Sequence, residues 1–112
     1  MKLNEYQELA MRTKNSQLKG VDELIYAVLK LNGEAGEVAE LVGKFIGQGR
    51  ELDPEEVLSE IGDVLWYVAL LASTLDVTLE DIAKLNILKL KNRYPDGFDA
   101  ERSKNRGGTD NE

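Results

Sequence analysis

Two pairs of acidic residues lie inside apolar helical patterns, at positions where a soluble protein usually has leucine. The first pair is Glu34 and Glu37, and the second pair is Glu60 and Asp63. The 22 residues between the pairs include glycines and a proline, which are enough to turn the chain back on itself. Four carboxylates that meet between two packed helices cannot all stay ionised without a counter-charge. A divalent metal ion is the simplest counter-charge, and it would indicate chemistry rather than scaffolding.

The positions of these acids around their helices favour such a cluster. At about 100° per residue, Glu34 falls at about −40° from Val38, inside an apolar arc, and Glu37 falls at about −100°, on its edge. Glu60 and Asp63 share their sector with apolar residues. Because residues three apart project side by side, two such pairs on antiparallel helices would form a nest of carboxylates. The alternative is a solvated helix face, since acidic pairs of this spacing recur elsewhere in the chain.

The absence of two residue types narrows the chemistry. The chain has no cysteine, which excludes a thiol nucleophile, a disulfide framework and cysteine-ligated zinc. It has no histidine, so a four-helix di-iron site, which needs Glu-x-x-His on two helices, is a poor match. Carboxylate oxygens suit Mg²⁺ or Mn²⁺ better than zinc or copper. We therefore expect Mg²⁺ as the cofactor, with Mn²⁺ as an alternative.

Glycines accompany both acidic pairs. Gly33 and Gly36 bracket Glu34, and Gly62 lies between the two acids of the second pair. Each glycine in a helix interior costs about 1 kcal/mol relative to alanine. We therefore expect something to approach the backbone closely at these positions, and both a packed helix and a bound ligand fit that expectation.

The elements that would hold these acids are helices. Apolar residues recur at helical spacing almost throughout the 112 residues, without the alternation typical of strands. This pattern predicts an all-α fold, a bundle of four to five helices in one domain over residues 1–98, with a polar tail over residues 99–112. The expected helix starts are an N-cap at Asn4 with Gln7 as its capping-box partner, an N-cap at Asp22, an N-cap at Asp53 before Pro54, and a start at Thr78. The expected helix ends are 15–20, about Gly47, about Leu75 and about Arg93.

The third expected helix is apolar on all sides. From Ile61 to Leu75 its only charged residue is Asp63. A helix of this kind is buried on all sides, and a chain of 112 residues can hardly surround one by itself. We therefore expect an oligomer whose interface covers this helix.

Charge and hydropathy exclude other classes of partner. The net charge is −7, and an acidic surface repels nucleic-acid polymers. No stretch reaches 18 consecutive apolar residues, and the N-terminus does not have the pattern of a signal peptide. We expect a soluble cytoplasmic protein without a membrane partner.

Three runs of sequence carry a family resemblance. They are GEAGEVAE at 33–40, EIGDVLWY at 60–67 and NILKLKNRYPDGF at 86–98. The order Glu-x-x-Glu, a gap, then Glu-x-x-Asp, together with the residues around the acids, resembles the MazG family of nucleoside triphosphate pyrophosphohydrolases. The resemblance covers most of the chain and fades after Arg106. Many members have a further acid directly before the first motif glutamate, where this chain has Gly33, so the number of metal ions is left open.

The resemblance implies a fold, a reaction and a set of ligands. It implies an all-α bundle assembled as a homodimer or homotetramer, and Mg²⁺-dependent hydrolysis of the bond between the α- and β-phosphorus atoms of a nucleoside triphosphate. The products would be a nucleoside monophosphate and pyrophosphate. Glu34, Glu37, Glu60 and Asp63 would be the metal ligands. Glu34 and Glu37 are also the candidate catalytic residues, because one of the glutamates, for which we favour Glu37, could instead take a proton from the attacking water.

Phosphates and a base also require partners. Lys89 and Arg93 lie four residues apart and can share a helix face, and Asn86 matches a polar substrate contact of the family. Lys44 is a further candidate cation, with solvation as its alternative. Trp66 could stack on a base or pack in the core. The complete set of candidate substrate-binding residues is Asn86, Lys89, Arg93, Lys44, Trp66 and Tyr94, with the tail residues Arg102, Lys104 and Arg106 as further cations.

Several functions are compatible with these features. We favour hydrolysis of non-canonical or excess (deoxy)nucleoside triphosphates in nucleotide-pool house-cleaning. A narrow dUTP or dCTP pyrophosphatase and, more distantly, a phosphoribosyl-ATP pyrophosphohydrolase have similar acids. A non-catalytic helical oligomer, in which the carboxylates serve only structure or an interface, belongs to another class.

Overall fold

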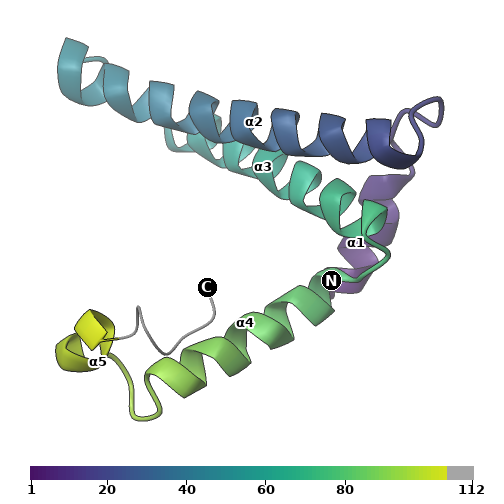
Figure 1. Ribbon diagram of the computed structural model, residues 1–112. Coiled ribbons are helices and arrows are strands. Elements are labelled where there is room, and N and C mark those ends of the chain that lie inside the picture. Colours follow the sequence, from purple (N-terminus) through teal and green to yellow (C-terminus); the bar gives the residue numbers. More distant parts are fainter. Residues whose placement is uncertain (106–112) are drawn as a thin grey trace. The chain divides into compact units, whose positions relative to one another are not determined.

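The computed structural model describes residues 1–105, and over these residues the chain is all-α (Figure 1). The only β feature within them is an isolated bridge between Pro95 and Gly97. The predicted fold class is therefore confirmed. The helices are α1 Leu3–Met11, α2 Gly20–Gln48, α3 Pro54–Thr74, α4 Leu79–Arg93 and α5 Ala100–Asn105.

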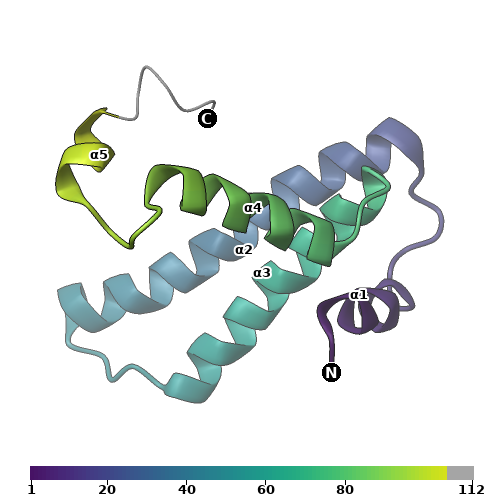
Figure 2. The same ribbon diagram turned by 90° about the horizontal axis from the view of Figure 1, so that it is seen from below.

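Helices α2 and α3 form an antiparallel hairpin that is visible in both views (Figures 1 and 2). Helix α2 ends at Gly49, whose φ of 67° is in the left-handed region that glycine adopts without a steric penalty. Helix α3 begins as predicted, with Pro54 in its first turn and the Asp53 carboxylate accepting a hydrogen bond from the Glu55 backbone at 3.1 Å. These two terminal signals set the reversal that brings the acidic pairs toward each other.

The predicted N-caps of the first two helices are wrong by two or three residues. The first helix is capped at Lys2, whose backbone N–H donates to the Glu5 carboxylate at 3.1 Å, and not at Asn4. The second is capped at Lys19, and Asp22 lies within its first turn. An acid in the first turn also faces the positive end of the helix dipole, so it signals the helix start without being the cap.

Helix α1 packs against the C-terminal half of α3 through a small core. Ala69, Ala72 and Leu79 are its buried residues. Tyr6 and Met11 of α1 pack against them. Since no bulky side chain in the described part of the chain is fully enclosed, this core alone gives modest stability.

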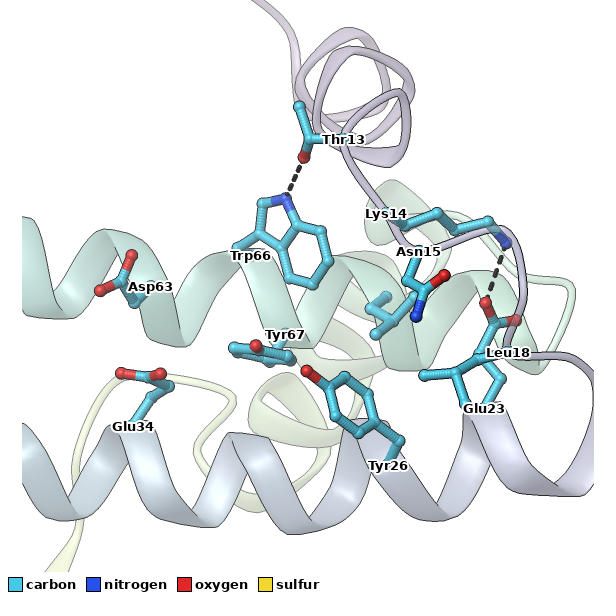
Figure 3. A pocket seen from close by; sticks show the side chains of 11 residues that line it. Thr13, Lys14, Asn15, Leu18, Glu23, Tyr26, Glu34, Asp63, Trp66 and Tyr67 are labelled. Carbon is cyan, nitrogen blue, oxygen red and sulfur yellow. Dashed lines mark hydrogen bonds and ion pairs between the residues drawn. The ribbon is translucent and has the colours of Figure 1, made fainter.

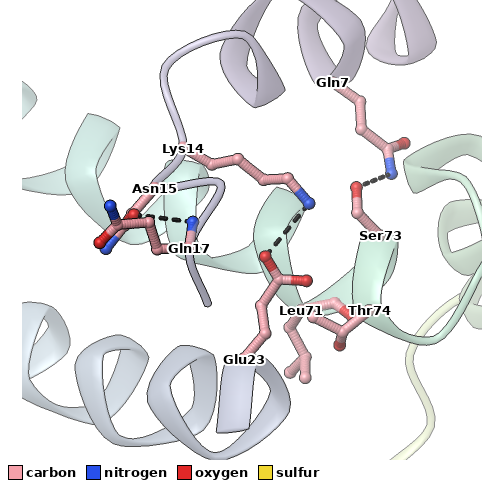
Figure 4. A network of polar contacts seen from close by, with 8 residues as sticks. All are labelled: Gln7, Lys14, Asn15, Gln17, Glu23, Leu71, Ser73 and Thr74. Carbon is pink, nitrogen blue, oxygen red and sulfur yellow. Dashed lines mark hydrogen bonds and ion pairs between the residues drawn. The ribbon is translucent and has the colours of Figure 1, made fainter. Parts of the chain in front are cut away.

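A buried amide ties α1 to the end of α3. Gln7 is only 8% exposed and is not a capping residue. Its Nε2 donates to Ser73 Oγ at 3.0 Å (Figure 4). The same Nε2 donates to the Val77 carbonyl at 3.1 Å, and the Gln7 Oε1 accepts from the Leu79 backbone N–H at 2.8 Å. One side chain thus satisfies polar groups across the whole turn between α3 and α4.

The chain divides into two compact units, residues 1–79 and residues from 80 onward. The first contains α1, α2 and α3, and the second contains nearly all of α4 together with α5. Helix α5 lies within the predicted polar tail.

Helix α3 exposes much of its apolar surface within this single chain. Leu58 is 66% exposed and Ile61 is 47% exposed. By length and composition alone the helix could cross a membrane, with a mean hydropathy of 1.3 over its most apolar 18 residues. The core helix of a soluble protein can satisfy the same two criteria, so this property does not distinguish a membrane from a protein partner.

Candidate active site

The hairpin brings three of the four predicted metal ligands together. Single carboxylate oxygens of Glu34, Glu60 and Asp63 lie within 4.8 Å of one another. Glu34 projects from α2 toward Asp63 on α3 (Figure 3). The acids meet because both pairs lie on the facing sides of the two antiparallel helices. We refer to these three residues as the carboxylate cluster.

The electrostatics of the cluster favour a cation. Partial burial raises the pKa of Glu60, and the neighbouring charges of Asp63 and Glu34 raise it further. Within residues 1–79, no lysine or arginine forms an ion pair with any of the three acids. The donors are all carboxylate oxygens, two of them on half-buried side chains. An oxygen-binding divalent ion therefore fits this site in both charge and ligand type.

Glu37 lies one turn further along α2 and is exposed. It is not among the three acids whose oxygens meet, although its charge contributes to the raised pKa of Glu60. Glu37 is therefore close enough to act electrostatically on the cluster, and its role as ligand or base stays a prediction.

The glycines around the acids have open space beside them within the first compact unit. A Cβ atom built at Gly33, Gly36 or Gly62 would meet no atom within 4 Å. Helices α1, α2 and α3 therefore do not supply the close neighbour expected at these glycines. Both alternatives, a further packed helix and a bound ligand, stay predictions.

A pocket of about 460 Å³ adjoins the carboxylate cluster (Figure 3). It is bounded by the loop between α1 and α2, by α2 and by α3, all within the first compact unit. The residues that line it are Thr13, Lys14, Asn15, Leu18, Glu23, Tyr26, Glu34, Asp63, Trp66, Tyr67 and Leu70. Acids at one end and aromatic rings in the middle give it both a charged and an apolar part.

Three aromatic rings form the middle of the pocket. The ring of Tyr67 meets Trp66 edge-on at a centroid distance of 4.8 Å and Tyr26 at 6.1 Å. The Trp66 indole is held by hydrogen bonds from its Nε1 to Thr13 Oγ1 at 2.9 Å and to the Ala10 carbonyl at 3.2 Å. Trp66 is therefore fixed by α1 and lines the pocket, and its stacking on a base stays a prediction.

Tyr67 stays protonated in this setting. Burial, followed by a hydrogen bond with Tyr26 and the negative charges of Glu34 and Asp63, raises the pKa of Tyr67 to about 12. A phenol with this pKa does not act as a base near neutral pH. Tyr67 therefore offers the pocket an apolar ring face and a neutral hydroxyl group beside the acids.

An ion pair closes the end of the pocket away from the cluster. Lys14 Nζ lies 3.1 Å from the carboxylate of Glu23, which is only 8% exposed (Figure 4). Sequence reasoning missed this end, together with Tyr26. Helical spacing could have indicated part of it, because Tyr26 lies eight residues before Glu34 and Tyr67 lies four residues after Asp63, on the same helix faces.

Lys44 is engaged elsewhere on α2. Its Nζ lies 2.9 Å from a carboxylate oxygen of Glu40, and this hydrogen bond and charge lower the pKa of Glu40. Ten residues separate Lys44 from Glu34, which is about 15 Å along the helix axis. The structure therefore does not place Lys44 at the pocket.

The other predicted substrate contacts belong to the second compact unit. Asn86, Lys89 and Arg93 lie on α4, and the ring of Tyr94 packs against Phe98 at a centroid distance of 5.5 Å. Their roles toward a substrate stay predictions. Of the tail candidates, Arg102 and Lys104 are on α5, Lys104 lies 3.9 Å from Glu101, and Arg106 lies outside the described residues.

Comparisons with known proteins agree with the carboxylate pattern. Residues 22–98 match the family model described as the MazG nucleotide pyrophosphohydrolase domain. The chain is 38% identical over 81 residues to the Gene 37 protein of Mycobacterium phage L5, covering 69% of this chain and 71% of that protein. It is 37% identical over 70 residues to the uncharacterized protein YvdC of Bacillus subtilis (strain 168), covering 54% of this chain and 66% of that protein. No solved structure matches the chain. The family match extends over more than half of the sequence, and the chain belongs to the MazG family of nucleotide pyrophosphohydrolases.

Proposed function

We propose that this protein hydrolyses (deoxy)nucleoside triphosphates to a nucleoside monophosphate and pyrophosphate, and that Mg²⁺ is its cofactor. The observation that carries the proposal is the carboxylate cluster at one end of a pocket lined by aromatic rings. Membership of the MazG family supports the reaction class. Removal of non-canonical or excess nucleotides from the cytoplasmic pool is the biological role that we propose.

Different acidic residues would have different roles in such a reaction. Glu34, Glu60 and Asp63 would hold Mg²⁺, for which Mn²⁺ could substitute, as the hard oxygen ligands these ions prefer. The ion would supply charge neutralisation at the phosphates and polarisation of the attacking water. Glu37, the exposed acid one turn along α2, would take the proton from that water as the bond between the α- and β-phosphorus atoms breaks.

The proposed substrate contacts are aromatic rings in the first compact unit and polar or charged residues in the second. The rings of Trp66 and Tyr67 offer apolar faces against which a base can pack. Asn86, Lys89 and Arg93 of α4 would contact the substrate, the two cations supplying the positive charge that the polyphosphate requires. Narrow specificity for dUTP or dCTP would be the same chemistry with a more selective pocket.

We also propose that the protein acts as a homodimer or homotetramer in which a second copy covers α2 and α3. Leu58 of α3 is 66% exposed, and Leu29 of α2 is also 66% exposed. Burial of this surface in a protein interface explains an apolar α3 that carries Glu60 and Asp63 in its middle, because a lipid environment would leave these charges unpaired. A nucleic-acid polymer is an unsuitable partner for a chain of net charge −7.

Sedimentation tests this assembly. We expect the wild-type protein to sediment as a dimer or tetramer, and Leu58→Arg to shift it toward smaller species because a charge replaces an exposed apolar side chain. Ser16→Arg, which adds the same charge at an exposed loop position of the same compact unit, is the matched control. Wild-type protein that stays monomeric at micromolar and higher concentrations would contradict the proposed assembly.

The chemistry is tested by product analysis. The protein would be incubated with Mg²⁺ and a panel of canonical and modified nucleoside triphosphates, and the products separated by chromatography. We expect monophosphate and pyrophosphate in equal amounts, with turnover lost in Glu37→Gln if Glu37 is the base. Diphosphate and phosphate as products would mean that a different bond is cut. No product from any nucleotide would favour a non-catalytic helical oligomer.

A further inference from the structure

The pocket beside the carboxylate cluster has a second polar end. Along α2, Tyr26 lies about 12 Å and Glu23 about 16 Å from Glu34, at 1.5 Å per residue. A nucleotide whose phosphates lie at the cluster and whose ring packs on the aromatic side chains directs its base edge toward this second end. The residues that meet such an edge come from the loop between α1 and α2 (Figure 3).

Most hydrogen-bonding groups in this part of the pocket already have partners. The Thr13 hydroxyl donates to the Ala10 carbonyl at 2.7 Å and accepts from Trp66 Nε1 at 2.9 Å. Lys14 is paired with Glu23 at 3.1 Å. These groups hold the loop in place, and reading a base with them would require breaking a contact within the protein.

Asn15 is different because only half of its amide is engaged. Its Oδ1 accepts a hydrogen bond from the Gln17 backbone N–H at 3.0 Å, which forms a turn that asparagine and aspartate favour (Figure 4). This bond fixes the orientation of the amide, since a backbone N–H requires an acceptor. The Nδ2 group, a donor only, is left on the pocket side, and within residues 1–79 it has no hydrogen-bond partner.

We propose that Asn15 is a specificity-determining residue that donates a hydrogen bond from Nδ2 to the ring carbonyl oxygen at C4 of a pyrimidine or C6 of a purine, so that the pocket prefers uracil, thymine and guanine. Cytosine and adenine carry an amino group in place of this oxygen, and two donors would then face each other. Such a mismatch leaves a polar group without a partner and weakens binding. The inference rests on the proposed function, because it assumes that the phosphates lie at the carboxylate cluster.

Asn15→Asp is the sharpest test. Aspartate keeps an oxygen for the Gln17 N–H and replaces the Nδ2 donor by an acceptor of nearly the same shape. We expect wild-type kcat/KM to be about tenfold higher for UTP than for CTP, and for GTP than for ATP. In Asn15→Asp both ratios should fall to one or invert. The added negative charge slows all substrates together, so it cancels from the ratios.

Ser16→Asp is the matched control. It adds the same charge at the neighbouring position, which does not line the pocket, and should leave both ratios at their wild-type values. A melting curve of each variant would confirm that the loop and α1 stay folded. An equal change of the ratios in both variants would mean that charge, and not the donor at Asn15, sets the preference.

Binding of monophosphates separates failure of this inference from failure of the proposed function. Trp66 is the only tryptophan and lines the pocket, so its fluorescence reports binding of UMP or CMP without turnover. Tighter binding of UMP, reversed in Asn15→Asp, supports the inference even if no triphosphate is hydrolysed. Hydrolysis with equal or inverted wild-type preference, or a preference that Asn15→Asp leaves unchanged, overturns the inference and leaves the proposed function standing.

Discussion

Glu60→Gln is expected to lower the turnover number for hydrolysis by about 10²–10³-fold and, in the same protein, to raise the melting temperature measured without metal. The variant replaces one charged carboxylate of the carboxylate cluster by a neutral amide. In the wild type, single carboxylate oxygens of the three acids lie within 4.8 Å of one another. Removing one preorganised charge of this kind costs about 10²–10³-fold in turnover. Substitution of a residue that is important only for folding would lower the activity and the stability of the protein together. A loss of activity with a gain in stability therefore identifies a site built for a ligand.

The stability effect follows from the sign of the pKa shift. The pKa of Glu60 is raised above its ordinary value of 4.5, first by burial and then by the neighbouring acids. An acid whose pKa is higher in the folded than in the unfolded protein favours folding at low pH. Without metal, the wild-type protein should therefore lose stability as the pH rises from 4.5 through the raised pKa, and Glu60→Gln should lack this component.

Addition of Mg²⁺ completes this test. A cation that binds only the folded protein stabilises it by linkage, so millimolar Mg²⁺ should raise the melting temperature of the wild type near neutral pH but change that of Glu60→Gln much less. Glu8→Gln, which neutralises an exposed acid of α1, should behave as the wild type in both turnover and Mg²⁺ response. Full activity or an unchanged Mg²⁺ response in Glu60→Gln would contradict a metal site at the carboxylate cluster.

Gln7→Ala is expected to lower the free energy of unfolding more than any other substitution proposed for this protein. The change leaves the Leu79 N–H, the Ser73 hydroxyl and the Val77 carbonyl without the partner that Gln7 provides. Each buried polar group left unsatisfied costs about 1–3 kcal/mol, so we expect a loss of about 2–4 kcal/mol in the free energy of unfolding. For a domain of this size, that corresponds to a fall of on the order of 10 °C or more in melting temperature.

Thermal or urea unfolding of a matched pair of variants measures this effect. Gln17→Ala removes the side chain of an exposed glutamine in the loop between α1 and α2, and it should change the free energy of unfolding by no more than about 0.5 kcal/mol. If the two glutamine variants were equally stable, the Gln7 hydrogen bonds would contribute nothing to the attachment of α1.

The sequence predicted those features that depend on helical periodicity and strong terminal signals. Apolar residues that recur about every 3.6 residues predicted the all-α class. Asp53 followed by Pro54 predicted the start of α3. The meeting of Glu34 with Glu60 and Asp63 was predictable because acids on facing sides of an antiparallel hairpin must converge.

Features that depend on long-range contacts were not predictable. Gln7 has the sequence context of a capping residue, but its amide is bonded to groups about 70 positions away. The caps at Lys2 and Lys19 have no preferred capping side chain, because their helices begin wherever packing of the following turns fixes them. Asn15 lies in a loop whose position depends on how α1 docks, and no periodicity encodes that.

Only part of the pocket wall lies within the stretch of sequence that matches the family model. The acids and all three aromatic rings lie within residues 22–98, the stretch that matches the family model, whereas the loop wall formed by Thr13, Lys14, Asn15 and Leu18 lies outside it. Under the proposed function, changes in this wall would leave the carboxylates of the reaction untouched. Relatives could then diverge in the nucleotide they accept while keeping the same chemistry, and exchange of the first 21 residues between relatives would produce that divergence in the laboratory.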